Sequence, residues 1–167
     1  CSKDYVKKLG VSKPVKILAT VLGGGMDRGF DDPDLGERLA KIAYEKAGVG
    51  PEDIDVAEFH DATAFGEVIQ AESMGFCPRG EGGIFAEQGH STLGGKLPIT
   101  PSGGLESKGH PVGATGAGQI AELVWQLRGE AGGRQVQNAR TALAENGGGN
   151  IGIEEAAMVI TILQADF

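Results

Sequence analysis

The sequence has few cysteines, no long apolar run and no cluster of basic residues. Its two cysteines, Cys1 and Cys77, are too few for a disulfide framework, so we expect a reducing, cytoplasmic location. No apolar stretch approaches the roughly 20 residues that cross a bilayer. The lysines near the start are not followed by the apolar stretch of a signal peptide. The sequence therefore predicts neither a membrane span nor a secretory leader.

The charge balance limits the class of partner. The formal net charge is −8, and the Lys and Arg residues form no run. Nucleic acids and anionic membranes both attract concentrated positive charge, so we expect neither as a partner. The 167 residues, 40% of them hydrophobic, fit one domain with a substantial core.

Glycine is the residue in excess. There are 29 glycines, more than twice the average usage of about 7%. They gather between apolar segments instead of spreading through a polar background, which is typical of tight turns and close backbone approaches. Such loops often form binding sites. The glycine clusters lie at residues 23–25, 80–83, 94–95, 103–104, 109–118 and 147–152.

Hydrophobic periodicity predicts strands and helices in near alternation. The expected strands are 15–22, 53–59, 97–100, 140–144 and 156–163. The expected helices are 2–10, 33–47, 62–74 and 113–127, with residues 76–95 as a loop. For the second helix we expect Asp32 as the cap, Pro33 at the first helical position and Gly48 as the stop.

This order implies a largely parallel sheet covered by helices, with an antiparallel last pair because only a short turn joins those strands. In open α/β sheets, ligands bind at the carboxyl ends of strands. Three loops follow predicted strands and have unusual compositions: residues 60–61, 102–118 and 146–149. We expect these loops to converge on one site.

The loop at 100–119, TPSGGLESKGHPVGATGAGQ, carries a single histidine, His110. Pro111 restricts the backbone of the residue before it, so His110 should be held extended. The glycines that follow open a helix whose N–H groups favour an anion. A histidine of near-neutral pKa can take a proton from a thiol. The alternative, a surface histidine in a flexible loop, is equally compatible with the spacing.

Two motifs make this sequence resemble the thiolases. Residues 102–104 (SGG) and 109–116 (GHPVGATG) resemble the thiolase histidine loop, and residues 60–65 (HDATAF) resemble the HDCF-type motif of sterol-carrier-protein-type and lipid-transfer-protein thiolases. The resemblance runs from about residue 15 to residue 163. It implies an α/β, thiolase-like fold: one βαβαβαββ half, with a five-stranded mixed sheet covered by helices. We expect residues 1–14 to be the tail of a preceding segment and residues 15–167 to be the thiolase C-terminal domain.

The resemblance also implies roles for particular residues. His110 matches the histidine that activates the nucleophilic cysteine, and it also helps to polarise a thioester oxygen. His60 matches the position that forms an oxyanion hole with a water. The substrate is expected to be an acyl-CoA, with no resident cofactor. The residues expected to bind it are Ser102, Gly103, Gly104, Gly109 and Gly148.

The sequence departs from the family at the acid/base cysteine. Ordinary thiolases have it at the start of the last glycine loop, where Glu145 and Asn146 stand here. Sterol-carrier-type enzymes have it in the HDCF motif, where Ala62 stands. Nothing selects between Asp61, Glu145 and a tyrosine as a substitute, and Tyr44 is interpreted as a packing residue. Cys77, the only interior cysteine, matches no catalytic position, and we interpret it as structural.

Other candidate sites are weaker. His90, His60 and His110 are enough for a metal site by number, but no pair has the helical spacing common in zinc enzymes, so we expect no metal. The glycine run at 113–118 matches neither the P-loop nor the dinucleotide pattern. Several acidic residues are interpreted as solvated charges: Glu37, Glu45, Glu52 and Glu122.

Three functional hypotheses follow. The chain is the C-terminal half of a thiolase-type acyl-CoA acyltransferase, a retro-aldolase half acting on a long or sterol-type acyl-CoA, or a non-catalytic acyl-CoA-binding module. In each case the resemblance implies a cysteine-bearing N-terminal half as a partner in the same or another chain. It also implies a homodimer and, in some lipid-transfer relatives, a small OB-fold protein that contains zinc. We expect the sheet face that meets the other half to be exposed in this chain alone.

Overall fold

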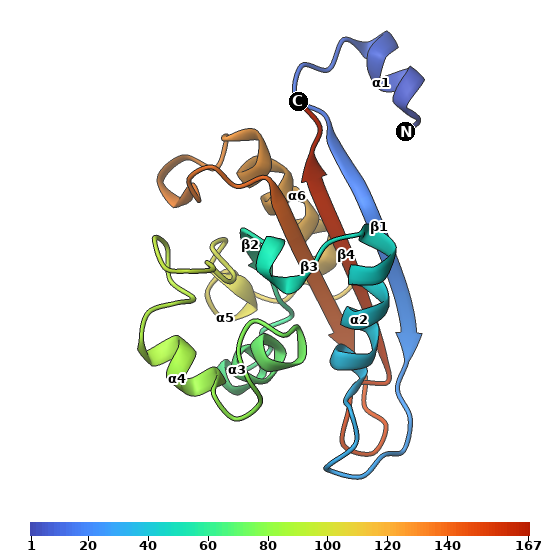
Figure 1. Ribbon diagram of the computed structural model, residues 1–167, viewed down its shortest axis with the longest axis vertical. Helices are drawn as coiled ribbons and strands as arrows, with labels where there is room; N and C mark the ends of the chain where they lie inside the picture. The colour runs from blue at the N-terminus through green and yellow to red at the C-terminus, as the bar shows by residue number, and fades with distance from the viewer.

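The computed structural model describes all 167 residues, Cys1–Phe167, and shows a mixed four-stranded sheet with helices on both faces (Figure 1). The order of strands across the sheet is β1-β4-β3-β2. The strands are β1 (Val15–Gly24), β2 (Val56–Glu58), β3 (Thr141–Gly148) and β4 (Ala157–Ala165). The helices are α1 (Lys3–Leu9), α2 (Leu35–Ala47), α3 (Ala64–Ser73), α4 (Gly82–Glu87), α5 (Gly104–Lys108) and α6 (Thr115–Arg128), with short 3-10 turns at Pro51–Asp53 and Gly132–Arg134.

Strand direction corrects the expectation of a largely parallel sheet. Only β2 and β3 pair in parallel, whereas β4 runs antiparallel to both of its neighbours, β3 and β1. The turn at residues 149–156 sends the chain straight back from β3 into β4. Because β4 then lies between β3 and β1, one short connection makes two of the three pairings antiparallel. The antiparallel last pair was predicted correctly.

The fifth predicted strand, residues 97–100, is absent as a strand. Ile99 forms one isolated parallel bridge to Ala57, flanked by the bonds Ala57 N–H to Pro98 O (3.0 Å) and Thr100 N–H to Ala57 O (2.8 Å). Pro98 has no N–H to extend the ladder, and Thr100 leaves the extended region at φ 47°. The segment therefore lies beside β2, in the expected place, but its pairing is too short to count as a strand.

Helix ends follow local capping chemistry. Gly10 and Gly48 end α1 and α2 in the left-handed conformation, as predicted. The predicted cap of α2 was wrong: Asp34 caps it by accepting the N–H of Glu37 at 2.8 Å, and Pro33 precedes the helix. The carboxylate of Asp32 is bonded to the N–H of Gly29 instead.

Two segments predicted as loops contain short helices. The six-residue α4 lies within the loop expected at 76–95, and the five-residue α5 lies within the histidine loop. Neither is long enough to show hydrophobic periodicity in the sequence. No helix in the structure is both long enough and apolar enough to cross a membrane.

The core lies mainly on one side of the sheet. A cluster of 19 buried residues fills the α2 and α3 side, whereas a cluster of nine lies on the α6 side. The thinner side leaves large apolar residues in solvent: Leu22 of β1 is 72% exposed, Ile17 is 63% exposed and Trp125 of α6 is 45% exposed. Helix α6 therefore covers only part of its sheet face, and β1 is a sheet edge.

Candidate active site

Two histidines from distant parts of the chain lie side by side. His60 follows β2, and His110 lies between α5 and α6. Their Nε2 atoms are 3.4 Å apart, and their ring centroids are 4.9 Å apart in an edge-to-face arrangement. The loops at 60–61 and 102–118, which were expected to converge, therefore do so.

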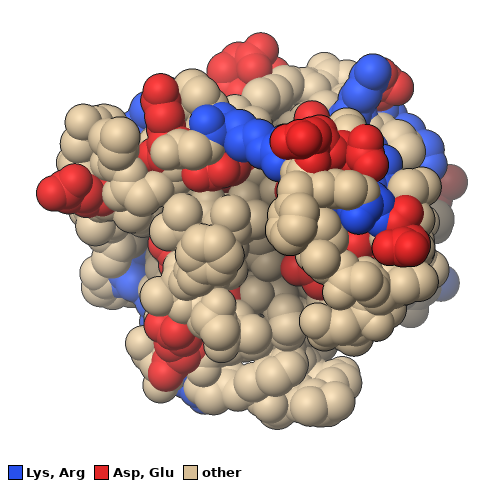
Figure 2. Space-filling model, turned by 90° about the horizontal axis from the view of Figure 1, so that it is seen from below, with Lys and Arg blue, Asp and Glu red and all other residues tan.

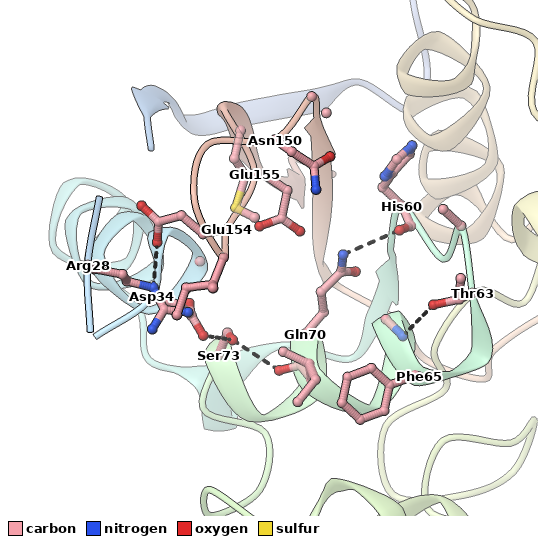
Figure 3. Close-up of a pocket in the computed structure, with 18 residues that line it drawn as sticks. Arg28, Asp34, His60, Thr63, Phe65, Gln70, Ser73, Asn150, Glu154 and Glu155 are labelled. Atoms are coloured by element: carbon pink, nitrogen blue, oxygen red, sulfur yellow. Dashed lines mark hydrogen bonds and ion pairs between the residues drawn. The ribbon is translucent and has the colours of Figure 1, made fainter. Parts of the chain in front are cut away.

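The third loop, at residues 146–149, reaches the same region. Gly148 lies with His60 on the wall of a cavity of about 350 Å³, together with Ala62, Phe65 and Glu155 (Figure 3). Seen from this end, the molecule is hollowed, and acidic and basic side chains are interspersed around a mostly uncharged surface (Figure 2). The cavity opens beside the histidine pair, so a bound molecule could reach both His60 and the end of β3.

The hydrogen bonds of His110 indicate which ring nitrogen is free to act as a base. Its Nδ1 lies 2.7 Å from the Thr115 hydroxyl, and that hydroxyl donates to Pro111 O at 3.4 Å. A hydroxyl has one hydrogen, so with that hydrogen on Pro111 the Nδ1–H of His110 must donate to Thr115. The lone pair of His110 then lies on Nε2, which faces His60.

His60 is held as the complementary donor. Burial, and after it the nearby His110, lowers the pKa of His60, so its ring is neutral at physiological pH. With an acceptor Nε2 on His110, the 3.4 Å contact places the hydrogen of His60 on its own Nε2. The pair thus offers one proton acceptor and one N–H donor in adjacent positions.

The backbone of His60 is anchored by a buried acid. The His60 N–H donates to Glu145 Oε2 at 3.1 Å, and Glu145 on β3 has no solvent exposure. Its Oε1 has no hydrogen-bond partner. Burial raises the pKa of Glu145 to about 8, so this carboxyl carries a proton at neutral pH. The other two candidates are also buried: Asp61 accepts the N–H of Leu105, and Tyr44 donates to Met74 O as a packing residue.

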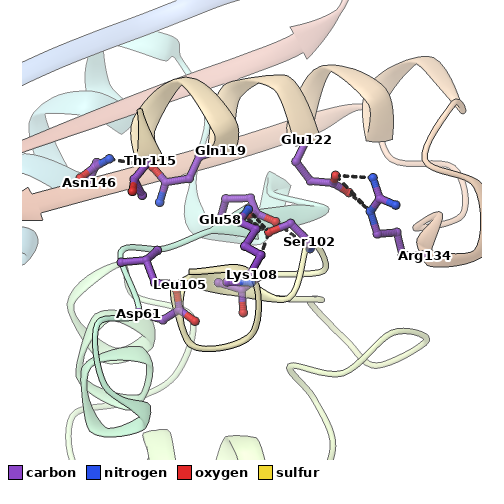
Figure 4. A network of polar contacts seen from close by, with 12 residues as sticks. Glu58, Asp61, Ser102, Leu105, Lys108, Thr115, Gln119, Glu122, Arg134 and Asn146 are labelled. Carbon is purple, nitrogen blue, oxygen red and sulfur yellow. Dashed lines mark hydrogen bonds and ion pairs between the residues drawn. The ribbon is translucent and has the colours of Figure 1, made fainter. Parts of the chain in front are cut away.

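Glu58 is a residue that sequence reasoning missed. It has no solvent exposure, and both of its oxygens accept from Ser102: Oε1 from the N–H at 3.0 Å and Oε2 from the hydroxyl at 2.7 Å (Figure 4). The signal was present in the alternation of the strand, because Glu58 shares a side of the chain with Ile54 and Val56, which are both buried. A carboxylate at an apolar position predicts a buried polar contact.

Two interpretations of polar residues outside the pair can be compared with the structure. Glu122, interpreted as a solvated charge, is buried and bonded to Arg134 at 2.8 Å, because α6 turns this side chain inward. His90 contacts Phe85 and Gln88 and lies apart from the histidine pair. No group of three His, Cys, Asp or Glu residues is arranged to hold a metal ion.

The predicted binding residues lie around α5. Ser102 and Gly109 line a shallow pocket together with Lys108 and Trp125, and Gly103 caps α5. Gly104 has its open side filled by the Asp61 carboxylate. Cys77 is half-buried against the main core, and burial raises the pKa of its thiol, as a structural role would require.

Replacing Gly104 by alanine is expected to destabilise the fold by about 2–4 kcal/mol. A Cβ atom there would lie 1.8 Å from Asp61 Oδ2, and the backbone φ is 62°. Gly94→Ala is the matched control, since its φ is 85° but nothing lies within 4 Å of its Cβ position. Urea unfolding should show a much smaller loss for the control; equal losses would mean that the contact with Asp61 is unimportant.

Comparison with known proteins places these features in a family. The thiolase C-terminal domain-like family model matches residues 36–162. Sterol carrier protein 2 from Rattus norvegicus is 45% identical over 175 aligned positions, covering 99% of this chain and 31% of that protein. The benzoylsuccinyl-CoA thiolase subunit BbsB from Thauera aromatica is 42% identical, covering 89% of this chain and 40% of that protein.

Solved structures agree on the fold. The Ltp2-ChsH2(DUF35) aldolase superposes with a TM-score of 0.76 at 26% identity, covering 92% of this chain and 40% of that chain. Human mitochondrial 3-ketoacyl-CoA thiolase superposes with a TM-score of 0.65 at 22% identity, covering all of this chain and 34% of the other. The chain thus spans about a third to two-fifths of the length of its relatives.

Proposed function

Since this chain belongs to the thiolase family and corresponds to its C-terminal domain, we propose that it is the C-terminal catalytic half of an acyl-CoA acyltransferase. The reaction is the thiolytic cleavage of an acyl-CoA or the reverse Claisen condensation. The observation that supports this proposal most directly is the 3.4 Å contact between the Nε2 atoms of His60 and His110. The nucleophilic cysteine comes from an N-terminal half, in the same or another chain.

In this proposal His110 is the general base. Its Nε2 takes the proton of the partner cysteine, and the resulting thiolate attacks the thioester carbonyl. The Thr115 contact holds the ring in the tautomer that this step requires. Once protonated, Nε2 is itself a donor and helps to polarise the thioester oxygen, the second role that the resemblance implies.

His60 supplies the other donor. Its neutral ring presents Nε2–H toward His110, so a thioester oxygen that enters between the rings can accept from it. Glu145 fixes the backbone of His60 from behind. Ser102, Gly103, Gly104, Gly109 and Gly148 stay assigned to acyl-CoA binding as part of this proposal, with no resident cofactor.

The exposed apolar surface supports a partner half. Leu22, Ile17 and Trp125 are large, exposed and on the thinner side of the fold, and burying them would remove apolar surface from water. We place the N-terminal half on this face. A homodimer of the assembled protein is also proposed. A small OB-fold protein that contains zinc is a further candidate, since one relative is named as a subunit and another is titled with a DUF35 partner.

A second candidate function is a retro-aldolase acting on a long or sterol-type acyl-CoA. It is favoured by the residues at the two acid/base cysteine positions, Ala62 and Glu145, and by the aldolase title of one structural relative. In that reaction a base takes the proton of a β-hydroxyl, the Cα–Cβ bond breaks, and its electrons form the thioester enolate. No acylated cysteine is formed.

The two functions are distinguished by supplying the assembled protein with a 3-oxoacyl-CoA plus CoA, or with a 3-hydroxyacyl-CoA alone. Acyltransfer predicts consumption of the first and a cysteine acyl adduct visible by intact mass. Retro-aldol cleavage predicts consumption of the second without added CoA and without an adduct. If neither is consumed while acyl-CoA still raises the melting temperature, the chain is a non-catalytic acyl-CoA-binding module.

A further inference from the structure

We propose that Lys108, acting with the buried Glu58, is a positioning residue that sets the place of His110 relative to His60. This inference rests on the proposed function, because it assigns the polar network behind the catalytic pair. Lys108 is the last residue of α5, and only Gly109 separates it from His110. The network lies beside the histidines without touching the cavity where substrate would bind (Figure 4).

One carboxylate holds both ends of the segment that leads to His110. At its start, Ser102 donates its N–H and its hydroxyl to the two oxygens of Glu58. At its end, the Lys108 ammonium lies 3.6 Å from Glu58 Oε2 and donates to the Ser102 hydroxyl oxygen. The path of residues 102–108 is therefore closed on Glu58, and the chain emerges at Gly109 in a fixed direction.

A second carboxylate holds the middle of the same segment. Asp61 Oδ1 accepts the N–H of Leu105 at 2.8 Å. Glu58 and Asp61 lie two residues before and one residue after His60. The acids that flank one histidine thus hold the segment that ends beside the other, so the relative position of His60 and His110 depends on these bonds.

Charge explains why a lysine is needed at this position. Glu58 has no solvent exposure, and burial raises the pKa of its carboxyl, whereas the bonds from Ser102 and the charge of Lys108 lower it. The neighbouring acid, Glu122, is bonded to Arg134. Without Lys108, Glu58 is expected to take up a proton. One of its oxygens would then become a donor and would compete with the Ser102 N–H or hydroxyl, releasing the start of the segment.

The test is kinetic and uses the assembled protein. Lys108→Met keeps the aliphatic stem and removes the charge; we expect kcat to fall roughly 10- to 100-fold, because displacements of about 1 Å have effects of that size. KM should change less than about threefold, since Lys108 does not line the cavity beside His60. Lys108→Arg should recover much of kcat, and Glu106→Gln, an exposed charge on the same helix, is the control.

Adding Glu58→Gln to Lys108→Met separates positioning from stability. The double variant has no buried charge, so it should regain the unfolding midpoint of the original protein while kcat stays low. If the double variant recovers kcat as well, or if Lys108→Met alone keeps kcat within about twofold, the positioning role is wrong.

A second readout does not depend on turnover. Imidazole nitrogen spectra of the assembled, histidine-labelled protein should show shifted His60 and His110 signals in Lys108→Met and an unchanged His90 signal. If the original protein turns over no substrate but these shifts occur, the proposed function fails while the positioning role stands. Unchanged His60 and His110 signals would overturn the positioning role.

Discussion

Replacing His110 by alanine in the assembled protein is expected to lower kcat by roughly 10²- to 10⁴-fold, the usual contribution of a general acid or base. The loss should fall on the acylation step, because the base that takes the cysteine proton is then absent. KM should change little, since most of the surface that binds an acyl-CoA is retained. Rapid mixing with an acyl-CoA, followed by intact mass of the cysteine-bearing half, measures this step directly.

The matched control for this variant is His90→Ala. His90 is a histidine of the same chain that contacts Phe85 and Gln88 and has no contact with the pair, so its replacement should leave kcat unchanged. The base assignment is contradicted if His110→Ala acylates at the original rate. If both variants lose activity equally, the loss reflects the fold and not the chemistry.

Replacing Glu145 by glutamine is expected to stabilise the fold on the alkaline side. Burial raises the folded-state pKa of Glu145 to about 8, whereas an unfolded glutamate titrates near 4.3. Between these values the unfolded chain has released the proton and the folded protein has kept it, so the free energy of unfolding falls as pH rises. Below the unfolded pKa both states are protonated, and this loss disappears.

The glutamine variant has no proton to lose at this position. Its amide oxygen can still accept the N–H of His60. The variant should match the original protein near pH 4.5 and exceed it by on the order of 3 kcal/mol near pH 8. Urea unfolding of this chain across that range measures the difference. Glu45→Gln, at an exposed position on α2, is the control and should show no such divergence; parallel curves for Glu145→Gln would mean that Glu145 is ionised in the folded protein.

Much of the fold could be predicted from the sequence because it is encoded locally. Apolar periodicity located all four strands, and the glycines at positions 10 and 48 marked the ends of two helices. The pairing of His60 with His110 was also anticipated, because loops at the carboxyl ends of neighbouring strands meet at one edge of a sheet. The motifs around these histidines then indicated the family to which the chain belongs.

The errors have a common physical origin. The segment at 97–100 has the composition of a strand, but pairing along β2 is a property of two segments and ends where Pro98 lacks an N–H. The direction of β4 was fixed by the position of the turn before it. Asp34 and Asp32 are both suitable caps, and only the arrangement of the preceding loop decides which carboxylate reaches the helix.

The sequence by itself determined the order of the elements, the two histidines and the family, since these depend on residues that are near in the chain or recognisable as motifs. Only the tertiary structure decided which acids are buried. Glu58, Glu122 and Glu145 look like ordinary acidic residues in the sequence, yet all three lie inside the fold. The free energy of a charge depends on what surrounds it in three dimensions, so its surroundings, and the role of Lys108 beside Glu58, emerge only when distant segments come together.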